Sequence, residues 1–285
     1  PFAKVDIDVA AEYACEDSLV SYELYNYLWE KISKNKSIVN IYTDIEMPLV
    51  PVLSNIEKNG VLIDSTQLNN LSKELEESLQ DIQKKCFKLT KKEFNLNSPK
   101  QLQEILYKDL EIPITKKTPT GKPSTDEDTL QFLAQSHKLP ALILDYRSLN
   151  KLKTGYTDKL PLLVCKKSGR IHTSYQQAIT ATGRLSSTEP NLQNIPIKSS
   201  QGRKIRNAFI AEPGKKIFAA DYSQIELRIM AHLSNDSNLL KTFNNNIDVH
   251  SFTASEIFNI DLNEVSSENR RAAKAINFGL IYGMS

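Results

Sequence analysis

The sequence predicts an α+β fold in which a long, mostly helical part precedes a part with short strands and further helices. Up to about residue 160, apolar residues recur at the three- and four-residue spacing of a buried helix face. From about residue 162 they form short runs instead, namely "LPLLVC", "RIHTSYQQA", "RNAFIA" and "KKIFAAD", which are typical of strands. We therefore place a boundary at residue 162.

The helical part opens with residues 5–33, where Leu19, Tyr22 and Tyr25 recur at threes. A second helix is expected within "YTDIEMPLVPVLSNIEKNG", with Asp44 as a possible N-terminal cap and Gly60 as its end. The stretch "VLID" then predicts a short strand or an extended link. A long helix follows from residue 64, because apolar residues spaced by three and four form a seam suited to a partner helix. The seam consists of Leu68, Leu71, Leu75, Leu79, Ile82, Cys86 and Leu89.

A loop separates the next two helices. Ser98 can cap the first of them, with Pro99 at its first position. The loop "KKTPTGKPSTDED" has no apolar periodicity and ends at Ser124 or Thr125, either of which can cap the following helix. That helix runs toward residue 153 and carries Leu130, Leu133, Leu142, Leu144 and Leu149.

The composition excludes several classes of protein. The chain has 285 residues, 40% of them hydrophobic and 25% charged, as in ordinary globular proteins. No apolar run approaches the roughly 20 residues that span a bilayer, and no leader peptide is visible. Three distant cysteines, Cys15, Cys86 and Cys165, fit a reducing cytoplasm and form no zinc motif. Walker A, G-x-S-x-G, H-E-x-x-H and dinucleotide-binding patterns are absent.

Positive charge is concentrated in two places, although the net charge is only +2. Residues 84–122 hold ten lysines against four acidic residues, and Lys198, Arg203, Lys204 and Arg206 form a second basic stretch. Clusters of this kind can follow a nucleic-acid phosphate backbone. Charge alone favours the simpler interpretation, that both stretches are solvated helix faces.

Asp221 follows the short apolar run 217–220, which predicts a buried strand. A carboxylate at the end of such a strand can face a cleft and hold Mg²⁺, which prefers oxygen ligands. The alternative is that Asp221 caps the next helix, where Ile225, Ile229 and Leu233 recur at fours. For an isolated aspartate the cap is the favoured interpretation.

The last predicted helix carries Arg270, Lys274, Phe278 and Tyr282 at intervals of four, which places them on one face. Two cations are thus followed by two aromatic rings over roughly 18 Å. A nucleoside triphosphate has the same order of groups, and a ring stacks on a base for about 1–3 kcal/mol. An amphipathic helix with buried rings and snorkelling cations explains the spacing equally well.

Three motifs taken together resemble the family A DNA polymerases, the family of bacterial DNA polymerase I. "DYSQIELRIMAHLS" resembles motif A, "RRAAKAINFGLIYG" resembles motif B, and "TATGRLSSTEPNLQNIP" is similar to a third hallmark. "IEMPLVPVLSNIEKNGVLID" and "EFNLNSPKQLQ" resemble the start of the polymerase region and the thumb. "YACED" resembles the Tyr-x-x-x-Asp motif that closes the 3′→5′ exonuclease domain, so the resemblance covers essentially the whole chain.

The resemblance implies a truncated right-hand polymerase architecture. Residues 1–33 would be the remnant of an exonuclease-like domain and residues 34–162 an elongated helical thumb. Residues 163–263 would be a partial palm with an antiparallel sheet and helices, and residues 264–285 would begin the fingers.

The resemblance also implies the roles of individual residues in template-directed DNA synthesis by two-metal phosphoryl transfer. Catalysis would involve Asp221 and Lys274, with Mg²⁺ held by Asp221 and the backbone carbonyl of Tyr222. The deoxynucleoside triphosphate would be bound by Arg270, Lys274, Phe278, Tyr282, Glu226, Gln224, His250 and Arg206, with Glu226 discriminating against a 2′-hydroxyl. Primer–template DNA would be contacted by Arg184, Asn191, Gln193, Asn194, Lys116, Lys117 and Lys122. Tyr13 and Asp17 would be left over from an exonuclease site.

The resemblance is incomplete, because the family's second catalytic aspartate lies in a Val-His-Asp-Glu element that this chain lacks. We therefore expect an internal piece of a longer polymerase that is cytoplasmic, nucleoid-associated and monomeric, and that acts in DNA replication and repair. We expect the piece alone to be inactive. The competing class is a non-catalytic DNA-binding relative that retains the scaffold.

Overall fold

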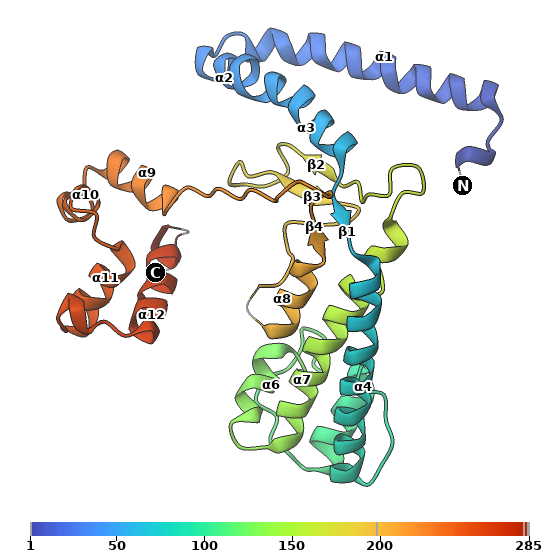
Figure 1. Ribbon diagram of the computed structural model, residues 1–285, viewed down its shortest axis with the longest axis vertical. Helices are drawn as coiled ribbons and strands as arrows, with labels where there is room; N and C mark the ends of the chain where they lie inside the picture. Colours follow the sequence, from blue (N-terminus) through green and yellow to red (C-terminus); the bar gives the residue numbers. More distant parts are fainter. Residues whose placement is uncertain (1, 198, 282, 284–285) are drawn as a thin grey trace. The chain divides into compact units, whose positions relative to one another are not determined.

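The computed structural model describes residues 2–197, 199–281 and 283 (Figure 1). Contacts within the chain divide it into two compact units, Pro1–Ile217 and Phe218–Ser285. The domain boundaries expected at residues 33, 162 and 263 remain predictions. Among the described residues, no helix is both long enough and apolar enough to cross a membrane.

The first unit begins with helices that leave most of their side chains exposed. Helix α1 starts after Asp6, whose carboxylate accepts a hydrogen bond from the backbone N–H of Asp8 (3.0 Å), and it buries no residue. The expectation of Asp44 as a cap is wrong, because the helical run starts earlier, with Asn35 as its cap. These elements are a 3₁₀ turn (Phe2–Lys4), α1 (Ile7–Ile32), α2 (Lys36–Ile41), a π-helical turn (Tyr42–Glu46) and α3 (Met47–Asn59).

Gly60 ends α3, as predicted. Its φ of +60° is unfavourable for residues with a side chain, and a Cβ there would lie 2.6 Å from the carbonyl oxygen of Ile171. The next residue, Val61, exchanges two backbone hydrogen bonds with Ile171 (2.8 and 2.9 Å). The close approach of these two segments therefore requires glycine at position 60.

The helical body of the first unit is built on the long helix α4, which packs against α7, while α7 also packs against α6 (Figure 1). Asp64 caps α4, and most of the predicted seam is buried. Leu89 is an exception at 44% exposure and lies one residue before the end of the helix at Thr90. The elements of the body are α4 (Ser65–Thr90), α5 (Pro99–Glu104), a π-helical turn (Ile105–Asp109), α6 (Glu127–Ala134), α7 (Lys138–Leu152), a π-helical turn (Lys153–Thr157) and a 3₁₀ turn (Leu160–Leu163).

Caps in this body are partly as predicted. Ser98 caps α5 through a hydrogen bond from the backbone N–H of Gln101 (3.4 Å). The cap of α6 is Asp126 rather than Ser124 or Thr125, and it accepts a hydrogen bond from the backbone N–H of Thr129 (2.9 Å). The single helix expected up to residue 153 is two helices, α6 and α7.

Two small antiparallel sheets complete the first unit. Strand β1 (Leu62–Ile63) pairs with β4 (Phe209–Ile210), and β2 (Ser174–Gln176) pairs with β3 (Ser186–Thr188). The strands expected in "VLID", "RIHTSYQQA" and "RNAFIA" are confirmed. "LPLLVC" contains a 3₁₀ turn instead of a strand. Helix α8 (Ser200–Asn207) precedes β4.

The second unit consists of helices. Helix α9 packs against α10, and α11 packs against α12 (Figure 1). The strand expected at 217–220 is wrong, because this stretch has no regular structure and its side chains are exposed, with Phe218 at 89%. The elements are α9 (Ile225–Ser234), α10 (Ser237–Asn244), α11 (Val249–Phe258), a 3₁₀ turn (Leu262–Glu264) and α12 (Ser267–Ile281).

Candidate functional site

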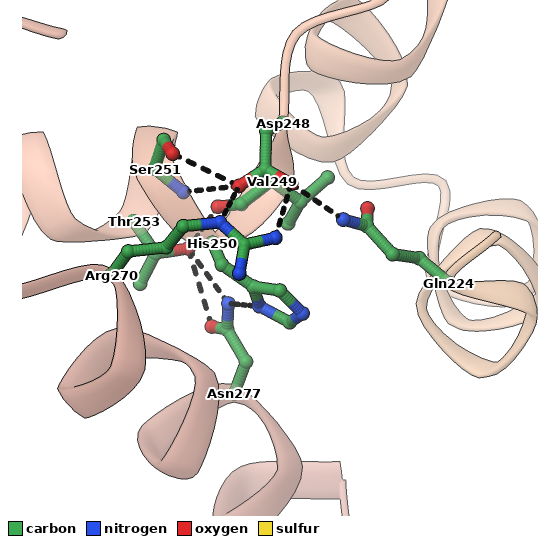
Figure 2. A network of polar contacts seen from close by, with 8 residues as sticks. All are labelled: Gln224, Asp248, Val249, His250, Ser251, Thr253, Arg270 and Asn277. Carbon is green, nitrogen blue, oxygen red and sulfur yellow. Dashed lines mark hydrogen bonds and ion pairs between the residues drawn. The ribbon is translucent and has the colours of Figure 1, made fainter. Parts of the chain in front are cut away.

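Asp248 is the centre of a polar network in the second unit (Figure 2). It caps α11, and its Oδ1 accepts hydrogen bonds from the backbone N–H and the hydroxyl of Ser251 (2.8 and 3.0 Å). Arg270 of α12 donates to both carboxylate oxygens, from Nε to Oδ1 (3.0 Å) and from Nη2 to Oδ2 (2.8 Å). Gln224, before α9, donates from Nε2 to Oδ2 (2.9 Å). One carboxylate thus joins three helices.

This network stabilises the charged forms of its two ionic partners. Burial alone would raise the pKa of Asp248, but hydrogen bonds from Arg270 and Ser251 hold that pKa well below its ordinary value. The hydrogen bond with Asp248 raises the pKa of Arg270, against a smaller opposing effect of burial. Asp248 is therefore an anion and Arg270 a cation throughout the physiological pH range.

A second set of hydrogen bonds orients the imidazole of His250. This ring is 2% exposed, and the side-chain amide of Asn277 donates to its Nδ1 (3.1 Å). The same amide donates to the hydroxyl of Thr253 (3.0 Å), which in turn donates to the backbone carbonyl of Val249 (2.9 Å). Since Nδ1 accepts, the proton of a neutral His250 lies on Nε2.

The predicted face of α12 is present as far as the structure describes it. The Lys274 ammonium lies 5.9 Å from the centroid of the Phe278 ring, and that ring lies 5.9 Å from the imidazole of His250. Lys274 is exposed and Phe278 is half-buried. Tyr282, the fourth residue of the predicted face, lies outside the described residues. A cation, an aromatic ring and an imidazole are thus neighbours at one place.

Asp221 and Tyr222 precede this network in an irregular, exposed segment, with Tyr222 at 81% exposure. Neither earlier interpretation of the local structure holds, because Asp221 does not end a buried strand and the cap position of α9 is Gln224. Glu226 lies in the first turn of α9 and is half-buried. Among the described residues, no group of three or more His, Cys, Asp or Glu side chains is arranged to hold a metal ion.

The first unit contains the other predicted site residues. Arg184, Asn191, Gln193 and Asn194 are exposed and lie on the loops on either side of β3. The Arg184 carbonyl accepts a hydrogen bond from the Thr180 hydroxyl (2.7 Å). The Asn194 carbonyl accepts one from the hydroxyl of Tyr156 (2.5 Å), which fixes this loop to the helical body.

The predicted lysines lie on a tight turn before α6. Lys116 forms an ion pair with Asp126 (2.8 Å), and hydrogen bonds from Lys116 and Thr129 hold the pKa of Asp126 well below its usual range. Lys117 and Lys122 are exposed beside it.

Three further candidates lie elsewhere in the first unit. Arg206 is exposed in the last turn of α8. Tyr13 and Asp17 are exposed one helical turn apart on α1.

Sequence reasoning missed Asp248 and Asn277. The pattern Asp-Val-His-Ser, with which α11 begins, is that of an aspartate cap, which could have been predicted. Its cationic partner lies 22 residues away and its amide partner 24 residues away, and no local pattern indicates either. Asn277 is a buried amide one residue before Phe278, and only the packing of α11 on α12 gives it partners.

Comparison with known proteins identifies the family to which the chain belongs. The model for DNA polymerase family A matches residues 65–285, and the chain belongs to that family.

Particular relatives extend this result. The chain is 54% identical over 285 residues to DNA polymerase I of Pseudomonas aeruginosa, covering 100% of this chain and 31% of the relative. It is 45% identical over 284 residues to DNA polymerase I of Treponema pallidum, covering 100% of this chain and 28% of the relative. It thus spans about a third of the length of these curated relatives.

A solved structure agrees with the fold. The POL domain of Pol1 from M. smegmatis, in complex with DNA primer-template and dNTP, matches with a TM-score of 0.84 and 42% identity. The match covers 93% of this chain and 46% of that chain. The α+β architecture of helices with small antiparallel sheets is therefore confirmed.

Proposed function

We propose that this chain belongs to a template-directed DNA polymerase and supplies the surface that receives the incoming deoxynucleoside triphosphate. The observation that carries the proposal is the face of α12, where Arg270, Lys274 and Phe278 follow one another beside the buried imidazole of His250. Cations suit phosphates, and an aromatic ring suits a base. Tyr282 would continue this face.

The residues that would contact the nucleotide have distinct tasks. Arg270 and Lys274 would neutralise the triphosphate as a primer 3′-hydroxyl attacks the α-phosphorus and pyrophosphate leaves. Phe278 would stack near the new base pair. Glu226 would exclude a 2′-hydroxyl, with Gln224 and His250 in support. Arg206 is assigned to this set by the family resemblance alone.

Asp221 and the carbonyl of Tyr222 would hold Mg²⁺. Asp221 fits this task because its carboxylate is exposed and accepts no hydrogen bond from any other described residue, so its oxygens are open to a hard cation. Bound Mg²⁺ supplies positive charge beside the phosphoryl oxygens. One carboxylate is too few to hold two ions, so at least one ligand besides Asp221 and Tyr222 would be needed.

The exposed residues of the first unit would hold primer–template DNA. Lys117 and Lys122 would contact the phosphate backbone, with Lys116 partly neutralised by Asp126. Arg184 would reach the minor groove, and Asn191, Gln193 and Asn194 would line the duplex. We propose that the complete protein is a monomeric enzyme of replication and repair at the nucleoid, and that Tyr13 and Asp17 are the end of its exonuclease site.

A chimera tests the proposed function. Residues 1–285 would replace the matching segment of the Pseudomonas aeruginosa DNA polymerase I, to which they are 54% identical. We expect the chimera to extend a primer with Mg²⁺, and Asp221→Asn to reduce extension by more than about a hundredfold, since lost support around a metal alone costs 10- to 100-fold. Asp261→Asn, an exposed aspartate of the same unit, should leave extension unchanged.

Two results would contradict the proposal. One is a chimera whose extension does not respond to Asp221→Asn. The other is a folded chimera that binds primer–template without extending it, which would favour the non-catalytic DNA-binding alternative.

A further inference from the structure

We propose that Asp248 is a positioning residue for the incoming nucleotide, which holds Arg270 so that one edge of its guanidinium remains directed to phosphate oxygens. This inference rests on the proposed function and adds to it a residue that the polymerase motifs do not include. It is carried by four observations around the Asp248 carboxylate (Figure 2).

The first observation is that Asp248 is itself fixed. As the cap of α11 it accepts two hydrogen bonds from Ser251, one of them from the backbone N–H. A carboxylate held by a helix terminus loses little further freedom when it binds a cation. Asp248 can therefore define the position of a mobile arginine side chain.

The second observation is how Arg270 binds. It uses the edge formed by Nε and Nη2, at 3.0 and 2.8 Å from the two oxygens of Asp248. Its Nη1 donates to no other side chain or carbonyl of the described residues. A planar guanidinium bound through one edge presents its remaining N–H groups in a known direction, which suits a tetrahedral phosphate.

The third observation is that the pair is accessible. The side chains of Arg270 and Asp248 are 43% and 34% exposed. A bidentate arginine–carboxylate pair with this exposure can stabilise the fold and still remain in contact with solvent. The same exposure allows a ligand to reach the guanidinium.

The fourth observation links the pair to the segment that carries Asp221. Gln224 donates to Asp248 while its own backbone has a φ of 54°, a left-handed conformation that needs support from its surroundings. Gln224 lies three residues after Asp221, so Asp248 constrains both the metal-binding segment and the phosphate-binding arginine. A loss of Asp248 should therefore affect nucleotide binding.

The test compares variants of the chimera in primer extension. Asp248→Asn should raise the KM for deoxynucleotide about tenfold, equivalent to about 1.4 kcal/mol, with kcat changed less than about twofold. In an Arg270→Lys background, which lacks the bidentate fork, the same change should have less than about a twofold effect. The matched control is Asp236→Asn, because Asp236 caps α10 by the same kind of hydrogen bond (2.8 Å) without an arginine partner among the described residues.

Three results would overturn the inference: an unchanged KM, an undiminished effect of Asp248→Asn in the Arg270→Lys background, or an equal effect of Asp236→Asn. A folded chimera that binds primer–template without extending it would refute the proposed function instead. In that case NMR of the Arg270 side chain in the 285-residue chain tests the role of Asp248 without relying on primer extension.

In that spectrum the Nε–H of Arg270 should be protected from exchange, should lose protection in Asp248→Asn, and should shift on addition of dATP in the wild type alone. Retained protection in Asp248→Asn, or no shift in the wild type, would overturn the inference.

Discussion

At the scale of single residues, His250 shows how burial and charge together set a protonation state. Burial lowers the pKa of its imidazole, and the positive charges of Arg270 and Lys274 act in the same direction, while Asp248 opposes them. The folded protein therefore favours the neutral ring. Its Nδ1 accepts from Asn277, so protonation at that nitrogen would also break a hydrogen bond.

This state predicts a pH dependence of stability. The unfolded state binds the His250 proton below about pH 6.5, whereas the folded state resists it, so stability falls as the pH decreases from 6.5 toward the lowered pKa. Between pH 7.5 and 5.5, the free energy of unfolding should fall by up to about 1 kcal/mol more in the wild-type chain than in His250→Asn. The amide oxygen of the new asparagine can still accept a hydrogen bond from Asn277. Urea unfolding at the two pH values measures the difference.

The control for this measurement is His232→Asn, because His232 is exposed on α9 of the same unit. An equal pH response in the wild type and in His250→Asn would contradict the prediction. Asp248 does not contribute to the difference in stability between pH 7.5 and 5.5. Its pKa is lowered in the folded state, so its contribution to stability is complete at any pH well above its unfolded pKa near 3.9.

At the scale of elements, α4 tests how far an apolar seam determines packing. Leu75 is fully buried and Leu89 is 44% exposed, although the spacing treats them alike. We expect Leu75→Ala to lower the free energy of unfolding by about 2–5 kcal/mol and Leu89→Ala by less than about 1 kcal/mol. Chemical denaturation of the two variants checks this, and equal losses would contradict it.

Elements with a strong internal pattern could be predicted from the sequence. The seam of α4 and the glycine after α3 give local signals, and so does the spacing of α12. The conformation of residues 217–220, before Asp221, could not be predicted from local pattern, because an apolar run becomes a strand only if another strand pairs with it. The face of α12 in the candidate site follows from local spacing, but the contacts of Asp248 do not, since its partners come from α12 and from the residue before α9.

At the scale of the whole molecule, the two kinds of predicted contact lie on different units. The residues proposed for duplex DNA belong to the first unit, and those proposed for the nucleotide and metal belong to the second, apart from Arg206. Duplex binding and nucleotide binding should therefore respond to different substitutions.

A salt titration tests this separation. The logarithm of the affinity of the chain for primer–template DNA should fall linearly with the logarithm of salt concentration, since each neutralised phosphate contributes about 0.9 to the slope. Replacing Lys117 and Lys122 by glutamine should reduce the magnitude of that slope by about 2. Fluorescence anisotropy with labelled duplex provides the measurement.

The matched control replaces two exposed lysines of the same unit, Lys34 and Lys36, and should leave the slope unchanged. Equal effects of both pairs would indicate general electrostatic attraction and contradict the assignment of the turn at Lys117 and Lys122. Lys116→Gln should contribute less than either neighbour, because Asp126 already neutralises it.

The junction at Gly60 has a consequence for protein engineering. Any side chain there would collide with the carbonyl oxygen of Ile171 and the ring of His172, so neither segment can be exchanged independently of the other. A recombination point placed between residues 60 and 171 would take the segment at Gly60 from one parent and the segment at Ile171 and His172 from another. Chimeras should therefore take both segments from one parent.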